Sequence, residues 1–151
     1  MGCFLPCLAS FNNKQQRFLN TVLMLVDESM SGWHPKTTKL GGLPNYKFEP
    51  HKHIPLGTMF QNGVECVSGI LVAQDVVQNP EKQASKAYFG EKSGLPDGSE
   101  ITAHTAEVLH LVEGANIHKG GWVGGDSWFG STMTAVEVMT KFGVPSSWII
   151  K

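Results

Sequence analysis

Short apolar runs bounded by polar and turn-forming residues dominate the first half of the chain, and this pattern predicts strands. Residues 21–26 form a nearly all-apolar run, which is typical of a strand buried on both faces. Two further runs rich in β-forming residues follow at 56–60 and 64–73. Asn62-Gly63 lies between them, and because both residues tolerate the positive φ angles of a type I′ turn, we expect a hairpin whose turn lies there.

The second half of the chain carries the three-to-four-residue period of helices. Apolar residues recur from Ala106 to Val112, and Gly114 follows as a stop signal. We therefore expect an amphipathic helix that begins near Thr102. Residues 120–126 indicate a short strand that opens into a glycine-rich turn.

A second helix is expected after this turn. Ser131 or Thr132 can cap its start, and Gly143 followed by Pro145 ends it. Residues 147–150 begin another buried strand. The apolar side expected for the second helix consists of Met133, Val136, Met139 and Phe142.

The connections between these elements complete the expected architecture. Residues 29–55 lack a stable period and are rich in glycine and proline, so we expect a long irregular connection, and residues 78–100 read as an exposed insertion. The order strand, hairpin, helix, strand, helix, strand predicts an α/β fold with a mixed sheet and helices packed on its faces. We expect residues 1–19 to form an N-terminal tail and residues 20–151 to form one domain.

The charge distribution restricts the classes of partner. The net charge is -1 and the pI is near 6.6, so the chain as a whole has no basic field of the kind that complete nucleic-acid-binding proteins show. Residues 1–55 nevertheless carry six basic against three acidic residues, whereas residues 56–113 carry three against eight. An anionic partner should therefore meet the N-terminal third.

Four lysines in this basic third are candidate DNA-binding residues. They alternate with aromatic and histidine side chains, a mixture that can contact phosphates and stack on bases; they are Lys36, Lys39, Lys47 and Lys52. The alternative is that they lie on a solvated loop. Since the chain has no apolar run long enough to cross a bilayer and no P-loop or dinucleotide-binding motif, we expect neither a membrane nor a small-molecule substrate as partner.

Two aspartates follow the ends of expected strands. Asp27 comes directly after the first apolar run, and Asp126 ends the strand between the two helices. In open α/β sheets, ligands bind beyond the carboxyl ends of the strands, so two such carboxylates could share a hard cation such as Mg²⁺ or Mn²⁺. The alternative is that both are ordinary turn or cap residues, a common role for aspartate.

Three ordered blocks of the sequence resemble the piggyBac transposase-derived family in its DDE domain. They are residues 26–33 (VDESMSGW), residues 47–57 and residues 124–131 (GGDSWFGS). The resemblance runs from about Asn20 to Lys151. It implies an RNase H-like fold in which the first and fourth strands are parallel neighbours, and it implies that Asp27 and Asp126 are the first two catalytic, metal-binding aspartates.

The resemblance also implies a limit on activity. The third aspartate of the family lies on a helix beyond the fifth strand, and the sequence ends before reaching it, so the chain is expected to be a partial domain that is inactive alone. DNA, a Mg²⁺ or Mn²⁺ cofactor, a homodimer of the full-length parent and nuclear localisation are further implications of the family. Two alternatives stay open: a domesticated, non-catalytic DNA- or protein-binding module, and a polypeptide destabilised by an uncovered last strand.

Overall fold

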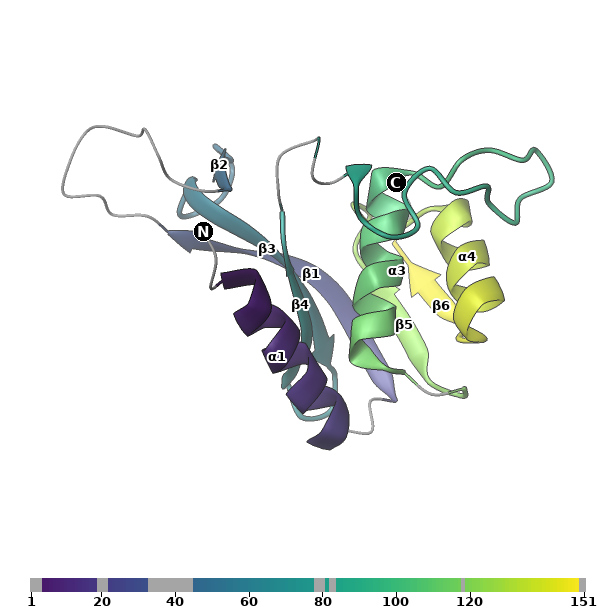
Figure 1. Ribbon diagram of the computed structural model, residues 1–151, viewed down its shortest axis with the longest axis horizontal. Helices are drawn as coiled ribbons and strands as arrows, with labels where there is room; N and C mark the ends of the chain where they lie inside the picture. Colours follow the sequence, from purple (N-terminus) through teal and green to yellow (C-terminus); the bar gives the residue numbers. More distant parts are fainter. Residues whose placement is uncertain are drawn as a thin grey trace.

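A mixed sheet with helices packed on one face forms the structure (Figure 1). The computed structural model of the chain describes residues 4–18, 22–32, 45–77, 81, 84–117 and 119–149. Along the described chain the elements are α1 (Phe4–Phe18), β1 (Leu23–Gly32), β2 (Tyr46–Phe48), β3 (Leu56–Glu65), β4 (Leu71–Val76), α3 (Ala103–Ala115), β5 (Trp122–Gly125), α4 (Thr132–Phe142) and β6 (Ser146–Trp148).

The strand order shows how the two halves of the chain share one sheet. The order is β2-β3-β1-β5-β6, and β4 also pairs with β3. β1 pairs with β3 and β3 with β4 in antiparallel fashion, whereas β1 with β5 and β5 with β6 are parallel pairs. The expected mixed α/β sheet is therefore confirmed, including the first strand's parallel pairing with the strand between the two helices.

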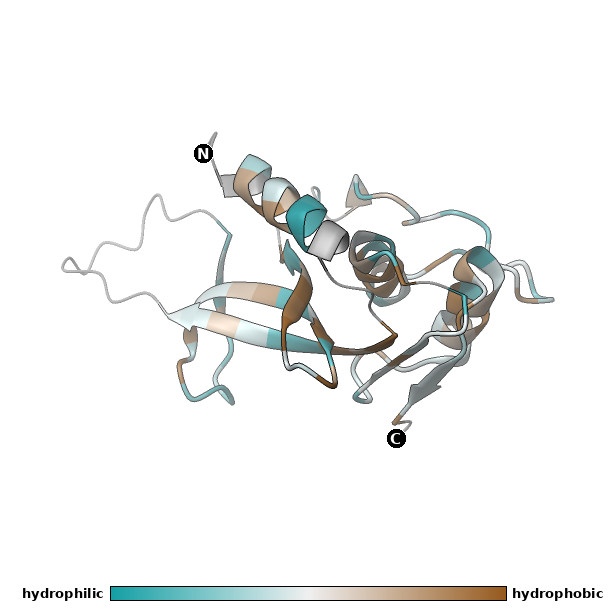
Figure 2. Cartoon of the chain, turned by 90° about the horizontal axis from the view of Figure 1, so that it is seen from below, coloured by the Kyte–Doolittle hydropathy of each residue, from teal (hydrophilic) through white to brown (hydrophobic). Residues whose placement is uncertain are grey.

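The described helices lie on the same side of the sheet. Both crossover helices, α3 and α4, connect parallel strands in the same direction across the sheet, and the right-handed rule places such helices on one face. Figure 2 shows α1 beside them, and α1 contacts both β4 and α3. No helix among the described residues covers the opposite face.

Alternation along β1 separates the two faces. Met24 and Val26 are 0% and 2% exposed because they point toward the helices, whereas Leu25 is 46% exposed on the other face. The helices complete the core with buried apolar residues that include Val108, Leu109, Leu111, Val112 and Val138. Burial of these residues supplies the main stabilising term for the fold.

The first helix of the second half begins as expected but ends later. The side chain of Thr102 caps α3 by accepting a hydrogen bond from the Thr105 backbone N–H, and Asn116 ends the helix in the left-handed conformation. Gly114 was expected to stop the helix, and that expectation is wrong because Gly114 lies inside the last turn. A Cβ at Gly114 would lie 3.6 Å from Cβ of Ala73 on β4, which is ordinary contact.

Gly114→Ala is therefore expected to stabilise the protein. Alanine in a helix interior is favoured over glycine by about 0.5–1 kcal/mol, and no clash offsets this gain. Thermal unfolding should show a Tm higher by roughly 1–4 °C. A lower Tm would mean that α3 and β4 tolerate no additional methyl group between them.

The second helix confirms its expected caps but only part of its expected buried side. Ser131 caps the start of α4, and Gly143 ends it with φ 67°. The buried residues of α4 are Thr134, Glu137 and Val138, whereas Met139 is 54% exposed. Of the residues expected on the apolar side, Met133, Val136 and Phe142 are half-buried and Met139 is exposed, so that expectation holds only in part.

Tertiary hydrogen bonds explain how α4 is oriented. The hydroxyl groups of Thr105 on α3 and Thr134 are 3.0 Å apart, and the Glu137 carboxylate accepts the Gly94 backbone N–H. The segment that contains Gly94 thus packs on α4, so the insertion is anchored by its backbone although most of its side chains are exposed. Polar contacts to neighbouring elements thus bury Thr134 and Glu137 beside the half-buried apolar residues of α4.

The hairpin exists, but its expected turn is wrong. β3 continues through Asn62-Gly63, and the chain turns at residues 66–69, where Gly69 has φ 69°. The Glu65 carboxylate stabilises this turn by accepting hydrogen bonds from the backbone N–H and hydroxyl groups of Ser68, which lower the pKa of Glu65.

Asn62 and Gly63 have other roles inside the strand. Asn62 donates to the Ser29 hydroxyl and accepts from the Gln74 side chain, so it joins three strands. Gly63 lies against Met24, because a Cβ there would be 2.6 Å from the Met24 sulfur. The glycine therefore serves close packing in the core, not a positive φ.

The N-terminal segment is a helix where the sequence predicts a tail. The Asn12 side chain on α1 donates to the backbone carbonyl of Gln74 and accepts its backbone N–H, both at 3.0 Å. These two bonds pair the backbone C=O and N–H of Gln74 at the outer edge of β4, and they hold α1 against the sheet. An isolated helix of this length is only marginally stable in water, so α1 depends on its contacts with the sheet.

Candidate functional site

Asp27 and Asp126 lie side by side at the end of the parallel pairing between β1 and β5. The last paired residues are Val26 and Gly125, and each aspartate is the next residue along the chain. β1 itself continues to Gly32 through its antiparallel pairing with β3, so the expectation that Asp27 follows the end of the strand is wrong. The parallel pairing of β1 with β5 ends at Val26, one residue before Asp27.

The two aspartates line one hollow on the sheet face opposite the helices. The hollow has a volume of about 630 Å³, and its wall combines the two carboxylates with apolar side chains from three neighbouring strands. Its apolar lining residues include Leu25, Trp122, Trp148 and Ile149. The structure therefore brings together the two residues that the sequence predicts as a pair.

Each carboxylate also forms a local hydrogen bond. Asp27 Oδ1 accepts the Glu28 backbone N–H at 2.7 Å, and Asp126 Oδ1 accepts the Trp128 backbone N–H at 2.9 Å. The second bond is an Asx turn, so the turn role considered for Asp126 is present. Both residues are exposed, and within the described ranges neither forms an ion pair.

The donor set of the hollow fits a single hard cation. Two carboxylates bring negative charge to one place, and Mg²⁺ is commonly held by one or two carboxylates while it keeps several waters. In the part of the chain that the structure describes, no group of three or more His, Cys, Asp or Glu residues could enclose a metal. The residues present thus suit an open site but not an all-protein metal cage.

Tryptophan rings packed on glycines form the wall beside the carboxylates. A Cβ at Gly124 would be 2.6 Å from Cζ3 of Trp122, and a Cβ at Gly125 would be 2.9 Å from Cζ3 of Trp148. These tryptophans were not predicted as residues of the site. The usable signal was the Gly-Gly pair two residues after Trp122, because strand glycines often mark close approach of another group.

A polar cluster lies on the helix side of β1, across the sheet from Asp27. Gln61 pairs with Glu28 in register, and its side chain donates to Oε2 of Glu107 on α3. Nδ1 of His104 lies 3.7 Å from the same oxygen. Hydrogen bonding to Glu107 raises the pKa of His104, although partial burial acts in the opposite direction.

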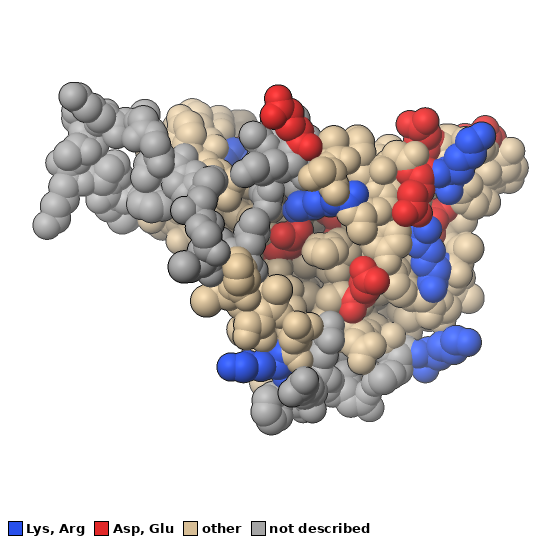
Figure 3. All heavy atoms as spheres, in the orientation of Figure 1, with Lys and Arg blue, Asp and Glu red and all other residues tan. Residues whose placement is uncertain are grey.

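Two of the four candidate DNA-binding lysines lie in the described chain. Lys47 forms an ion pair with Glu49 at 2.9 Å, and Lys52 forms one with Glu28 at 3.0 Å. The other two, Lys36 and Lys39, lie outside the described residues. On the described surface visible in Figure 3, basic and acidic side chains are interspersed, so the role of the lysines in DNA binding stays a prediction.

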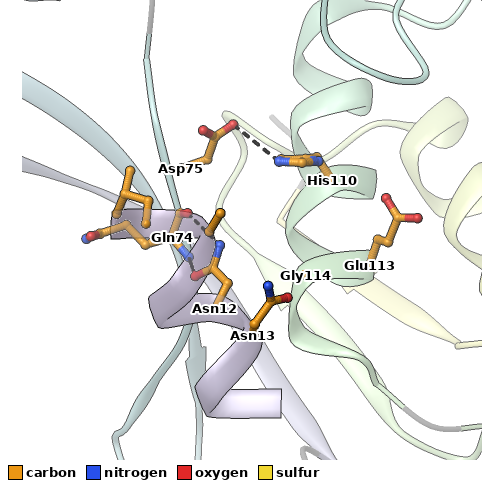
Figure 4. A pocket seen from close by; sticks show the side chains of 9 residues that line it. Asn12, Asn13, Gln74, Asp75, His110, Glu113 and Gly114 are labelled. Atoms are coloured by element: carbon orange, nitrogen blue, oxygen red, sulfur yellow. Dashed lines mark hydrogen bonds and ion pairs between the residues drawn. The ribbon is translucent and has the colours of Figure 1, made fainter. Parts of the chain in front are cut away.

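A second hollow of about 340 Å³ lies between α1, β4 and α3 (Figure 4). Asn12 and Gln74 meet on one side of it, and Asp75 faces His110 at 3.9 Å on the other. Asp75 also forms an ion pair with Lys86. These contacts join the N-terminal helix to the sheet and give this hollow a structural role.

No helix in the described part of the chain is both long and apolar enough to cross a membrane.

Comparison with known proteins identifies the fold. No family model and no curated protein matches the sequence. Among solved structures, the chain is similar to one described as "Cryo-EM structure of piggyBac transposase synaptic complex with hairpin DNA", with a TM-score of 0.61 and 12% identity. The match covers 88% of this chain and 24% of that chain, so the chain spans about a quarter of the transposase's length. The chain thus has the fold of part of a piggyBac transposase.

Proposed function

We propose that the chain is a transposase-derived DNA phosphoryl-transfer domain in which Asp27 and Asp126 hold a Mg²⁺ or Mn²⁺ ion. One observation carries the proposal: two exposed carboxylates, each one residue beyond the last pair of the parallel β1–β5 pairing, line one hollow in a fold shared with part of a piggyBac transposase. The carboxylate pair is the feature of that hollow suited to metal-assisted chemistry.

The roles of the residues follow from their chemistry. A divalent ion, when bound, stabilises charge on a transferring phosphate and on the attacking and leaving oxygens. Asp27 and Asp126 would bind the ion through their remaining oxygens, while the Asx turn holds the Asp126 carboxylate in place. Lys36, Lys39, Lys47 and Lys52 would contact phosphates of the DNA, and the protein would act in the nucleus.

We expect these residues to have no strand-transfer activity alone, because within the described part of the chain the hollow offers two carboxylates, which leave a two-ion site under-coordinated. The second candidate is a non-catalytic module that keeps the fold to bind DNA or protein. The Asx turn of Asp126 favours it, because that turn gives Asp126 a purely structural use. The two candidates differ in whether the hollow binds a metal.

Mn²⁺ is expected to raise the Tm of the native protein, and Asp27→Asn or Asp126→Asn should remove this rise. At a Mn²⁺ concentration of about 100 Kd, binding to the folded state contributes about 2.7 kcal/mol. That corresponds to a Tm increase of roughly 5–10 °C for a chain of this size. Thermal unfolding with Mn²⁺ and with EDTA measures the difference.

Asp97→Asn is the matched control. Asp97 accepts the Ser99 backbone N–H in the same type of turn at 3.0 Å, but it lies outside the hollow. Asparagine keeps the side-chain oxygen that accepts the turn hydrogen bond, so Asp126→Asn and Asp97→Asn both retain their turns. A difference between them in the Mn²⁺ response therefore does not come from a lost turn. An unchanged Mn²⁺ response in Asp27→Asn and Asp126→Asn, or the same loss in Asp97→Asn, would contradict the proposed metal site.

A further inference from the structure

The turn that follows β5 holds Asp126 through two hydrogen bonds of its own backbone. The Trp128 backbone N–H donates to Asp126 Oδ1 at 2.9 Å, and the Gly130 backbone N–H donates to the Asp126 carbonyl oxygen at 3.1 Å. These bonds fix the carboxylate relative to residues 126–130. The position of the carboxylate in the hollow therefore depends on what holds this turn against the rest of the protein.

A buried threonine on α4 ties the turn to both helices. The Thr134 side chain is 0% exposed, and its hydroxyl oxygen lies 3.1 Å from the Phe129 carbonyl oxygen inside the turn. The hydroxyl oxygens of Ser131 and Thr105 lie 2.9 Å and 3.0 Å from the same atom. One oxygen atom thus contacts the turn, the cap of α4 and the first turn of α3.

The chemistry of these groups fixes the direction of the bonds. A backbone carbonyl can only accept, so the single hydroxyl proton of Thr134 points at Phe129. The lone pairs of the Thr134 oxygen are then left for the hydroxyl protons of Ser131 and Thr105. Since the Thr102 hydroxyl donates to Thr105, a directed chain of hydroxyl groups runs from the cap of α3 to the turn after β5.

Burial makes the bond from Thr134 difficult to replace. Phe129 and Thr105 are each 1% exposed, so water has little access to the carbonyl and hydroxyl groups that meet there. A buried polar group that loses its partner costs its desolvation free energy. If the Thr134 hydroxyl were removed, the Phe129 carbonyl would regain a donor only by moving, and the turn would move with it.

A movement of the turn would also disturb the wall of the hollow. An added Cβ at Gly130 would lie 2.6 Å from Cβ of Trp148, so the turn and β6 are in close contact. Trp148 lines the hollow together with Asp126. A displaced turn would therefore change both the carboxylate and the indole beside it.

We propose that Thr134 is a positioning residue for the candidate metal site, because its hydroxyl group holds the turn that places the Asp126 carboxylate in the hollow. Thr134 itself does not line the hollow, and it acts through the backbone of Phe129. This inference rests on the proposed function, since it concerns the same metal site.

The test compares the Mn²⁺ affinity of threonine variants, measured from the EPR signal of free Mn²⁺ at a temperature below every Tm. Thr134→Val keeps the shape of the side chain and removes its hydroxyl group. It should weaken Mn²⁺ binding by roughly 10-fold, the lower end of the loss that follows removal of a group that orients a metal ligand. Thr134→Ser restores the hydroxyl group and should bind Mn²⁺ nearly as tightly as the native protein.

Thr105→Val is the matched control. It removes a hydroxyl group that is equally buried and belongs to the same contact, but Thr134 keeps its bond to Phe129. Its Mn²⁺ affinity should therefore stay close to the native value. Thermal unfolding verifies that each variant is folded.

A measurement on the native protein needs no substitution at Thr134. The NMR signal of the Phe129 carbonyl carbon, observed through the Gly130 amide, should shift when Mg²⁺ is added, and Asp126→Asn should abolish the shift. An unchanged carbonyl signal would overturn the coupling between the turn and the metal site, even if Thr134→Val failed to fold.

The outcomes separate the positioning role from the metal site. Native-like Mn²⁺ affinity in Thr134→Val, an equal loss in Thr105→Val, or no recovery in Thr134→Ser would overturn the role of Thr134. If Asp27→Asn and Asp126→Asn lose the Mn²⁺ response while Thr134→Val keeps it, the proposed metal site stands without Thr134. If the native protein binds no Mn²⁺, both proposals are overturned.

Discussion

Phe129→Ala is expected to lower the free energy of unfolding by about 3–5 kcal/mol, the cost of removing a fully buried phenylalanine. Phe129 is 1% exposed and belongs to the core cluster between the sheet and the helices. It also anchors the turn after β5, because the Thr134 hydroxyl donates to its backbone carbonyl. Denaturant unfolding measures the loss, and the Tm should fall by roughly 10 °C.

The neighbouring residue supplies the control for Phe129→Ala. Trp128 is the larger side chain, but it is 54% exposed, so Trp128→Ala should cost less than Phe129→Ala, about 0.5–1.5 kcal/mol for the lost edge-to-face contact with His104. If the two variants lost the same stability, the orientation of this turn would be wrong. The Asp126 carboxylate would then also be misplaced, since the same turn holds it.

Gly124→Ala is expected to destabilise the protein by about 1–3 kcal/mol, the usual cost of inserting a methyl group into a closely packed place. The new Cβ would overlap the Trp122 ring, at 2.6 Å from Cζ3, and would lie 3.1 Å from the Ser147 backbone carbonyl oxygen. Either the indole or the β5–β6 pairing must move. Because Trp122 lines the hollow with Asp27 and Asp126, the Mn²⁺ response should weaken as well.

A double-mutant cycle tests whether the ring is the cause. Trp122→Phe shortens the side chain, so Gly124→Ala should cost less in that background than in the native protein. Gly114→Ala is the matched glycine substitution, because its added Cβ meets only ordinary contacts and is expected to stabilise. Strict additivity of Gly124→Ala and Trp122→Phe would place the clash at Ser147 or elsewhere.

Local signals in the sequence were sufficient wherever a structural feature depends on a few adjacent residues. The start of α4 at Ser131 and its end at Gly143 agree with the structure, because caps depend on the side chain and φ angle of a single residue. The short strand around Trp122 and the mixed sheet also agree. The order of elements alone is enough to indicate the architecture.

The same local reasoning was wrong wherever distant residues compete with it. Asn62-Gly63 has the sequence of a tight turn, but Asn62 hydrogen-bonds to Ser29 and Gln74, and Gly63 packs against Met24. A continuous β3 makes all of these contacts, which a turn at that place would forfeit. The turn that Glu65 and Ser68 stabilise lies a few residues later, so the chain reverses there without losing the contacts of Asn62 and Gly63.

Part of the candidate site was predicted from the sequence, and part was not. The pairing of Asp27 with Asp126 was predicted from their positions after apolar runs and from the resemblance to piggyBac transposases, and the structure places them at adjacent ends of one parallel pairing. The tryptophans that line the hollow and the His104–Trp128 contact were not predicted. They join residues from different strands and helices, and no spacing along the chain records such contacts.

The sequence by itself determined the order of strands and helices, the caps of α4 and the pair of acidic residues that follow buried runs. These depend on hydrophobic period and on backbone preferences that act over a few residues. Only the tertiary structure decided where β1 and β3 end, which side of α4 is buried and which aromatic rings surround Asp27 and Asp126. Those features are set by packing between segments far apart in the chain, where the gain from a shared core and satisfied hydrogen bonds exceeds any local preference.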